Sequence, residues 1–96
     1  MATVIMQRWD ALTPAQYDTL RGIVRWDQDL PEGMRFHVAS FDDGILRMTD
    51  VWDSAEQFNE FVTGRIVPGL QKLGIAGQPD IIVTTAHELT DTGAAH

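Results

Sequence analysis

The order of hydrophobic and polar residues predicts four strands and two helices. Hydrophobic residues alternate with polar ones, as in strands, over residues 2–9, 35–41, 45–52 and 80–87. They recur three and four positions apart, as in helices, over residues 13–27 and 54–73. The predicted βαββαβ order indicates an α+β domain with a four-stranded antiparallel sheet over residues 1–89, followed by a flexible tail at 90–96.

Both helices begin at recognisable capping signals. Thr13 offers a cap hydroxyl directly before Pro14, and Gln16 follows the cap at the spacing of a capping box. Ser54 and Gln57 repeat that spacing at the second helix. These signals predict helix starts near residues 13 and 54.

The helix ends are predicted from three residues. Trp26 should close the first helix as a partly exposed anchor. Pro68 lacks an amide donor and clashes with the preceding turn, so the second helix should kink there. The helix should then resume and stop at Gly74, because glycine readily adopts the left-handed conformation that ends a helix.

The turn between the second and third strands sets their register. A two-residue type I′ turn at Asp43-Gly44 would place His37 opposite Asp50. A three-residue turn with Gly44 in a bulge would instead place His37 opposite Thr49. Both registers are open from the sequence.

Hydrophobic residues occur on both faces of the predicted sheet. In the second strand, Phe36 and Val38 point one way, while Ala39 and Phe41 point the other. Two helices can cover only one of these faces. Because a large exposed apolar face is unusual on a monomer, we expect a second copy of the chain to cover the other face in a homodimer.

Composition narrows the possible partners and chemistry. The 96 residues carry a net charge of −7, which disfavours nucleic acid and anionic membrane surfaces. No apolar run approaches the length of a membrane span, and no secretory signal is evident, so we expect a cytoplasmic protein. The absence of cysteine excludes disulfides and cysteine nucleophiles.

Element order and spacing resemble those of the antibiotic-biosynthesis-monooxygenase-like superfamily over almost the whole chain. The residues that carry the resemblance are the strand-to-helix join Val51-Trp52-Asp53-Ser54, then Phe58 and Phe61, then Pro68, Leu70 and Leu73-Gly74. The resemblance implies a ferredoxin-like fold that pairs sheet to sheet as a dimeric α/β barrel. Members include cofactor-free monooxygenases that act on polycyclic polyketides, haem-degrading enzymes and proteins without an assigned activity.

The resemblance also bears on cofactors. The haem-degrading members place a tryptophan and a histidine ligand at positions that correspond to about Phe61 and Gln71 here. Neither residue can play that part, so we expect no haem and no other cofactor. No histidine spacing prearranges a metal site, so we expect no metal either.

His37 is the first candidate for chemistry, with Asp50 as its partner. A carboxylate beside an imidazole orients the ring and raises its basicity, which suits a general base or an anchor for a phenolic substrate. The alternative is a structural histidine that is hydrogen-bonded within the sheet or at the dimer contact.

Six further residues are candidates for contact with a substrate. They are aromatic, basic or flexible side chains near the predicted sheet and its ends: Trp9, Tyr17, Arg35, Met48, Trp52 and His87. The two-residue turn would place Arg35 opposite Trp52. For the aromatic residues and Met48, ordinary packing in the core is the alternative role.

Two hypotheses for the function follow. The first is a cofactor-independent monooxygenase or related enzyme that acts on an aromatic, polyketide-like molecule between sheet and helices. The second is a non-enzymatic homodimer that binds a small hydrophobic or aromatic ligand or serves as a scaffold. A pocket filled by side chains, or lined only by aliphatic groups, would favour the second.

Overall fold

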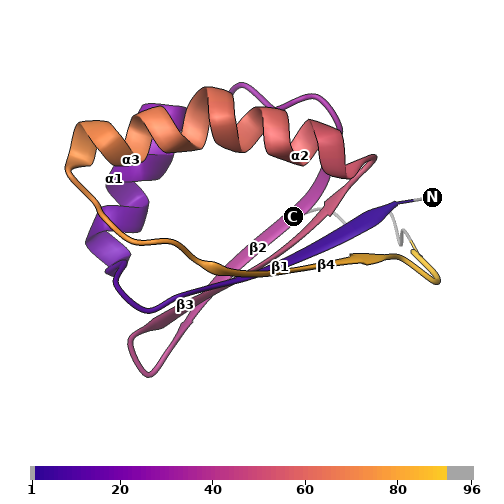
Figure 1. Cartoon of the computed structure of the whole chain (residues 1–96), viewed down its shortest axis with the longest axis horizontal. Coiled ribbons are helices and arrows are strands. Elements are labelled where there is room, and N and C mark those ends of the chain that lie inside the picture. Colours follow the sequence, from indigo (N-terminus) through magenta and orange to yellow (C-terminus); the bar gives the residue numbers. More distant parts are fainter. Residues whose placement is uncertain (1, 91–96) are drawn as a thin grey trace.

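A computed structural model of the chain describes residues 2–90, which form a four-stranded antiparallel sheet in the order β2-β3-β1-β4. Helices cover one face of the sheet (Figure 1). In chain order the elements are β1 (Thr3–Trp9), α1 (Pro14–Val24), β2 (Met34–Asp42), β3 (Ile45–Trp52), α2 (Ala55–Phe61), the π-helical turn η1 (Val62–Ile66), α3 (Val67–Leu73) and β4 (Asp80–Thr85). The predicted α+β fold of ferredoxin-like βαββαβ order is confirmed. The tail predicted at 90–96 lies outside the described residues beyond Thr90.

Helix α1 begins as predicted and ends earlier. Thr13 and Gln16 form the predicted capping box. The helix stops at Val24 because Arg25 adopts a left-handed conformation, with φ of 61°. That reversal takes Trp26 out of the helix and into the core, where only 7% of it is exposed. The prediction of Trp26 as a partly exposed anchor at the helix end is therefore wrong.

The second helical segment accommodates its proline without ending. Ser54 caps α2 as predicted, and Gly74 ends α3 in a left-handed conformation with φ of 68°. The irregularity falls ahead of Pro68, in η1, where the Val67 amide donates to the Val62 carbonyl five residues back. Pro68 follows this π-helical turn directly, and the changed hydrogen-bond pattern there accommodates a residue that has no amide proton.

Helices α1 and α3 pack closely at Gly69. A Cβ atom at this position would lie 2.8 Å from Leu20 Cδ1 and 3.0 Å from Val24 Cγ2, which is closer than packed side chains allow. Glycine at this position therefore lets α3 rest directly against α1. This contact holds the two helices side by side.

The β2-β3 hairpin has the register of the two-residue turn. Asp43 and Gly44 both have positive φ angles, 54° and 79°, and His37 pairs with Asp50. The same register does not extend to Arg35, because a bulge between Met34 and Phe36 leaves Arg35 without a partner across the sheet. The prediction that Arg35 lies opposite Trp52 is therefore wrong.

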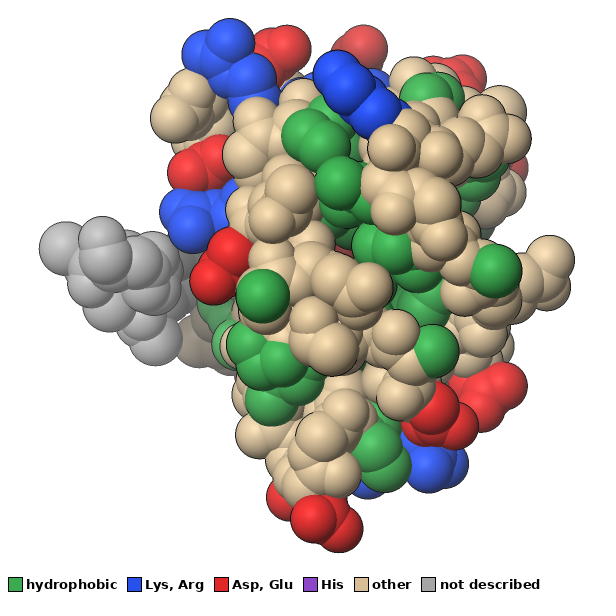
Figure 2. Space-filling view, turned by 90° about the vertical axis from the view of Figure 1, so that its left-hand side faces the viewer, with side chains coloured by type: hydrophobic (Ala, Val, Ile, Leu, Met, Phe, Trp, Pro, Cys, Tyr) green, Lys and Arg blue, Asp and Glu red, His purple; other side chains and the backbone are tan. Residues whose placement is uncertain are grey.

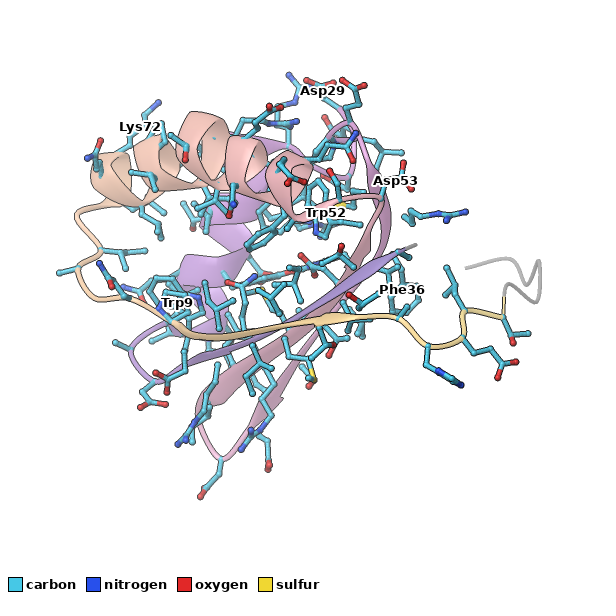
Figure 3. All side chains as sticks on the ribbon, turned by 45° about the vertical axis from the view of Figure 1, so that its right-hand side comes forward. Trp9, Asp29, Phe36, Trp52, Asp53 and Lys72 are labelled. Carbon is cyan, nitrogen blue, oxygen red and sulfur yellow. The ribbon has the colours of Figure 1, made fainter. Side chains whose placement is uncertain are left out.

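The sheet has one covered and one open face within residues 2–90. Trp52 and Trp9 lie between the helices and the sheet (Figure 3). On the opposite face, Val38 and Met6 belong to one row across the strands, and 46% and 39% of their surfaces are exposed. Phe36 lies in the adjacent row and is 45% exposed. The predicted second apolar face is confirmed, and no described element of the chain covers it.

Candidate functional site

A cavity of about 410 Å³ lies between the sheet and the helices. Its walls are mainly hydrophobic, and they come from the covered face of the sheet, from α1, from the segment that runs from α2 to α3, and from the loop before β4. Figure 2 shows the end of the molecule formed by that loop, where hydrophobic side chains gather across the middle of the face. The polar side chains on the cavity wall are Gln7, Tyr17, His37, Asp50, Gln71 and Gln78. The cavity is therefore suited to a largely apolar molecule with few polar groups.

Four side chains on the sheet and α1 form a chain of hydrogen bonds at this wall. The Tyr17 hydroxyl lies 2.9 Å from His37 Nε2, and His37 Nδ1 lies 2.6 Å from Asp50 Oδ1. The other carboxylate oxygen, Asp50 Oδ2, accepts a hydrogen bond from Trp52 Nε1 at 3.2 Å. Alternation in β3 brings Asp50 and Trp52 to the same side of the sheet, and the hairpin register adds His37.

The donors and acceptors in this chain determine where its protons lie. The indole nitrogen of Trp52 can only donate, and an ionised carboxylate can only accept. His37 therefore presents an Nδ1 proton to Asp50. In a neutral imidazole the other nitrogen, Nε2, is then an acceptor, so the Tyr17 hydroxyl donates to it.

Burial strengthens the electrostatic effect of this arrangement. Only 3% of Asp50 is exposed, so its carboxylate is separated from water and its two hydrogen bonds replace solvent. Burial also raises the pKa of Tyr17 above its usual value of 10.0, and the nearby Asp50 carboxylate acts in the same direction, although Arg21 opposes both. Tyr17 is therefore a neutral phenol across the physiological pH range.

Trp26 is part of the site although the sequence assigned it no role there. Its ring lies edge-on to both Tyr17 and His37, with centroid distances of 5.6 Å to each, and it lines the cavity. Such contacts restrict the rotation of both rings. Helical periodicity misled the prediction, because the left-handed Arg25 that redirects Trp26 has no sequence signal comparable to a glycine.

The structure brings most of the predicted site residues together. Trp9, Tyr17 and Met48 line the cavity with His37 and Asp50. Trp52 lies behind the cavity wall instead, fully buried against Phe58 and Phe61, and it contacts the site through its hydrogen bond to Asp50.

Two predicted substrate-contacting residues lie away from the cavity. Arg35 is exposed, and its guanidinium lies 3.6 Å from the Asp53 carboxylate, because the bulge at Arg35 takes it out of the strand register. His87 follows the end of β4 and is exposed. β4 ends at Thr85, two residues before His87, so the sheet does not position this imidazole. Neither residue belongs to the candidate site.

The described residues contain no cluster of three or more histidine or acidic side chains arranged to hold a metal ion. Phe61 and Gln71, the positions that correspond to the haem-binding residues of haem-degrading proteins, both line the cavity. Neither side chain supplies an imidazole to iron. Of the helices in residues 2–90, none combines the length and the hydrophobicity that crossing a bilayer requires.

Fold and site together define a small ferredoxin-like α+β protein with an apolar cavity and a buried histidine–aspartate pair on its wall. Comparison with solved structures specifies the fold further. A proposed antibiotic biosynthesis monooxygenase from Chloroflexus aurantiacus aligns over 95% of this chain and 98% of its own, with 18% identity and a TM-score of 0.67. SnoaB, a cofactor-independent oxygenase from Streptomyces nogalater, aligns over 92% of this chain and 94% of its own, with 14% identity and a TM-score of 0.65.

A protein of unknown function from Nitrosomonas europaea aligns equally well, over 94% of this chain and 95% of its own, with 16% identity and a TM-score of 0.68. No protein-family model and no curated protein sequence matches the chain. The chain therefore has the fold of the antibiotic biosynthesis monooxygenases, as its element order predicted. At these identities the likeness concerns the fold, and the activity has to be argued from the site.

Proposed function

We propose that this protein is a cofactor-independent monooxygenase that acts on an aromatic, polyketide-like molecule held in the cavity. The observation that carries the proposal is the His37–Asp50 pair, because its 2.6 Å hydrogen bond lies at the wall of an otherwise apolar cavity. A buried carboxylate stabilises the imidazolium that forms when His37 gains a proton. The similarity of the fold to that of SnoaB supports this class of reaction.

The reaction needs a base and dioxygen. Loss of a proton from an anthrone, or from its phenolic tautomer, gives an electron-rich anion that transfers electrons to dioxygen. Oxygen adds at the ring carbon as a peroxide, and loss of water leaves a quinone carbonyl. One oxygen atom thus enters the product and the other leaves in water, so anthrone and dioxygen are fully accounted for. The apolar cavity separates the reactive anion from bulk water.

A homodimer belongs to the same proposal. The open sheet face presents Met6, Phe36, Val38 and Ile82, each 39% to 58% exposed, in adjacent rows. A second copy of this face would bury these side chains by an isologous contact. The covered face, which carries the cavity, is left free by such a contact.

Oxygen uptake with anthrone tests the proposal. Wild-type protein should consume dioxygen and form the quinone, while His37→Ala should lose about 100-fold or more of the rate. His87→Ala is the matched control, because that imidazole is exposed and lies away from the cavity. Equal rates in wild type and His37→Ala would remove His37 from the mechanism.

A ligand-binding protein without catalysis is the second candidate. One observation favours it: both His37 nitrogens already have partners within the chain, as expected for a structural histidine. In that case anthrone should bind to wild type without oxygen uptake. Haemin, followed through its absorption band, provides a separate test, since stoichiometric binding would contradict a cofactor-independent site.

A further inference from the structure

The placement of Tyr17 leads to an inference about which group meets the substrate. We propose that the Tyr17 oxygen, rather than His37, receives the substrate's acidic proton, so that the site selects an uncharged hydroxyarene that donates a hydrogen bond. This inference rests on the proposed function: Tyr17 is the residue that contacts the substrate, and an uncharged hydroxyarene is the class of substrate.

Access to His37 is the first argument. Its Nε2 atom, the nitrogen available for base catalysis, lies 2.9 Å from the Tyr17 hydroxyl. The other nitrogen is engaged with Asp50, and only 16% of the His37 side chain is exposed. The Trp26 ring also packs against both His37 and Tyr17 in edge contacts. A substrate in the cavity therefore reaches the hydroxyl of Tyr17 without displacing any existing hydrogen bond.

The balance of protons is the second argument. When His37 is neutral and its Nδ1 proton faces Asp50, the Tyr17 hydroxyl donates to His37 Nε2, and the oxygen of Tyr17, which lines the cavity, can still accept a hydrogen bond. When the substrate gives its acidic proton to the Tyr17 oxygen, either from its hydroxyl or from the ring carbon of its keto tautomer, the original Tyr17 proton passes to His37 Nε2. The products are the substrate anion, a neutral Tyr17 and an imidazolium held by Asp50. Tyr17 is never ionised, in agreement with its raised pKa.

The charge of the cavity wall is the third argument. Within the described part of the chain, its lining residues include no lysine or arginine, and the one carboxylate among them belongs to Asp50. A substrate that carries a permanent carboxylate would meet no counter-ion there and would be repelled by Asp50. A substrate whose oxygen is methylated could not donate to the Tyr17 oxygen and would leave that acceptor without a partner. An uncharged hydroxyarene satisfies both requirements.

Binding of three matched probes tests the selection. The three probes share a nitrophenyl ring and differ in one substituent. Nitrophenol carries a hydroxyl donor, nitroanisole a methyl ether and nitrobenzoate a carboxylate. With the pH adjusted so that the phenol is neutral, we expect wild type to bind nitrophenol about tenfold more tightly than either of the others. Tyr17→Phe should bind nitrophenol and nitroanisole equally. A preference for nitrophenol that survives in Tyr17→Phe and disappears in His37→Ala would overturn the proposal.

Proton transfer is tested without dioxygen. Under argon in deuterated water, the anion of anthrone takes up deuterium at its ring carbon, which mass spectrometry records. We expect wild type to accelerate this exchange, and both Tyr17→Phe and His37→Ala to reduce the acceleration at least about tenfold. The relay would be overturned if Tyr17→Phe accelerated the exchange as much as wild type does, or if wild type did not accelerate it at all. Exchange without oxygen uptake in air would instead contradict the monooxygenase proposal and leave the relay supported.

Discussion

His37 Nδ1 and Asp50 Oδ1 lie 2.6 Å apart across the β2-β3 hairpin, on the side of the sheet that the helices cover. Their meeting depends on the two-residue turn at Asp43-Gly44, since a one-residue shift of register would turn one of the two side chains to the open face. The candidate chemistry thus depends on the conformation of a turn at the far end of the hairpin.

The first prediction concerns that turn. Gly44 has φ of 79°, so Gly44→Ala should cost about 1 to 2 kcal/mol of unfolding free energy, although no atom lies within 4 Å of the added Cβ. Gly22→Ala is the control, with the opposite effect on the free energy of unfolding. An added Cβ there also meets no atom, but Gly22 lies within α1, so alanine should stabilise the protein by roughly 0.5 to 1 kcal/mol. Urea unfolding measures both. A Gly44→Ala protein as stable as wild type would contradict the assigned turn.

The second prediction concerns the tautomer of His37. Asp50→Asn keeps the shape of the side chain and its acceptor for Trp52 Nε1, but turns an amide donor toward His37 Nδ1. His37 should then protonate at Nε2 and donate to Tyr17. We expect the variant to stay folded with a loss of about 1 kcal/mol and to lose about 100-fold or more of anthrone exchange.

Nitrogen NMR of the imidazole should report the change of tautomer in Asp50→Asn directly. Asp53→Asn is the matched control, because that carboxylate is exposed and, among residues 2–90, forms an ion pair with the exposed Arg35 alone. An Asp50→Asn protein with wild-type exchange would show that the orientation of the His37 proton has no effect on the chemistry.

The third prediction concerns pH. Burial raises the pKa of Tyr17 above 10.0 in the folded protein. At a pH between the Tyr17 pKa of the unfolded chain and that of the folded protein, the unfolded chain has lost the phenolic proton and the folded protein has kept it. The free energy of unfolding therefore falls as the pH rises through this range. Below pH 10 the phenol is protonated in both states, and its contribution to stability is fully retained.

Tyr17 is the only tyrosine in the sequence, so tyrosinate absorbance reports on this residue alone. The titration midpoint of the folded protein should lie above 10.0. In urea unfolding above that pH, wild type should lose stability more steeply than Tyr17→Phe. A midpoint at or below the ordinary value would contradict the buried, hydrogen-bonded environment described for the hydroxyl.

The fourth prediction concerns the open sheet face and the proposed homodimer. Val38→Asp places a carboxylate on a side chain that is 46% exposed on that face, so it should dissociate a dimer while leaving the covered core intact. Ser40→Asp is the control, since Ser40 lies on the same strand and face but pairs with Arg47, near the turn. Sedimentation equilibrium should give a monomer for Val38→Asp and a dimer for both wild type and Ser40→Asp. A monomeric wild type at high concentration would remove the proposed dimer.

The sequence by itself determined the starts of the two helices and the two faces of the sheet. Thr13 with Gln16, and Ser54, specified the two helix starts because capping involves residues three positions apart. For the turn at Asp43-Gly44 the sequence left two registers open, and the structure has the one that pairs His37 with Asp50. Alternation also separated the covered face of the sheet from the open one.

Tertiary structure decided the features that depend on how α1 and the sheet meet. Tyr17 and His37 are 20 residues apart in the sequence, and their hydrogen bond forms because α1 packs over the covered face of the sheet. Gly69 lets α3 pack closely beside α1. The left-handed Arg25 brought Trp26 into the cavity wall, and a bulge removed Arg35 from it. Local patterns do not determine such placements, because they arise from packing between segments that are distant in the sequence.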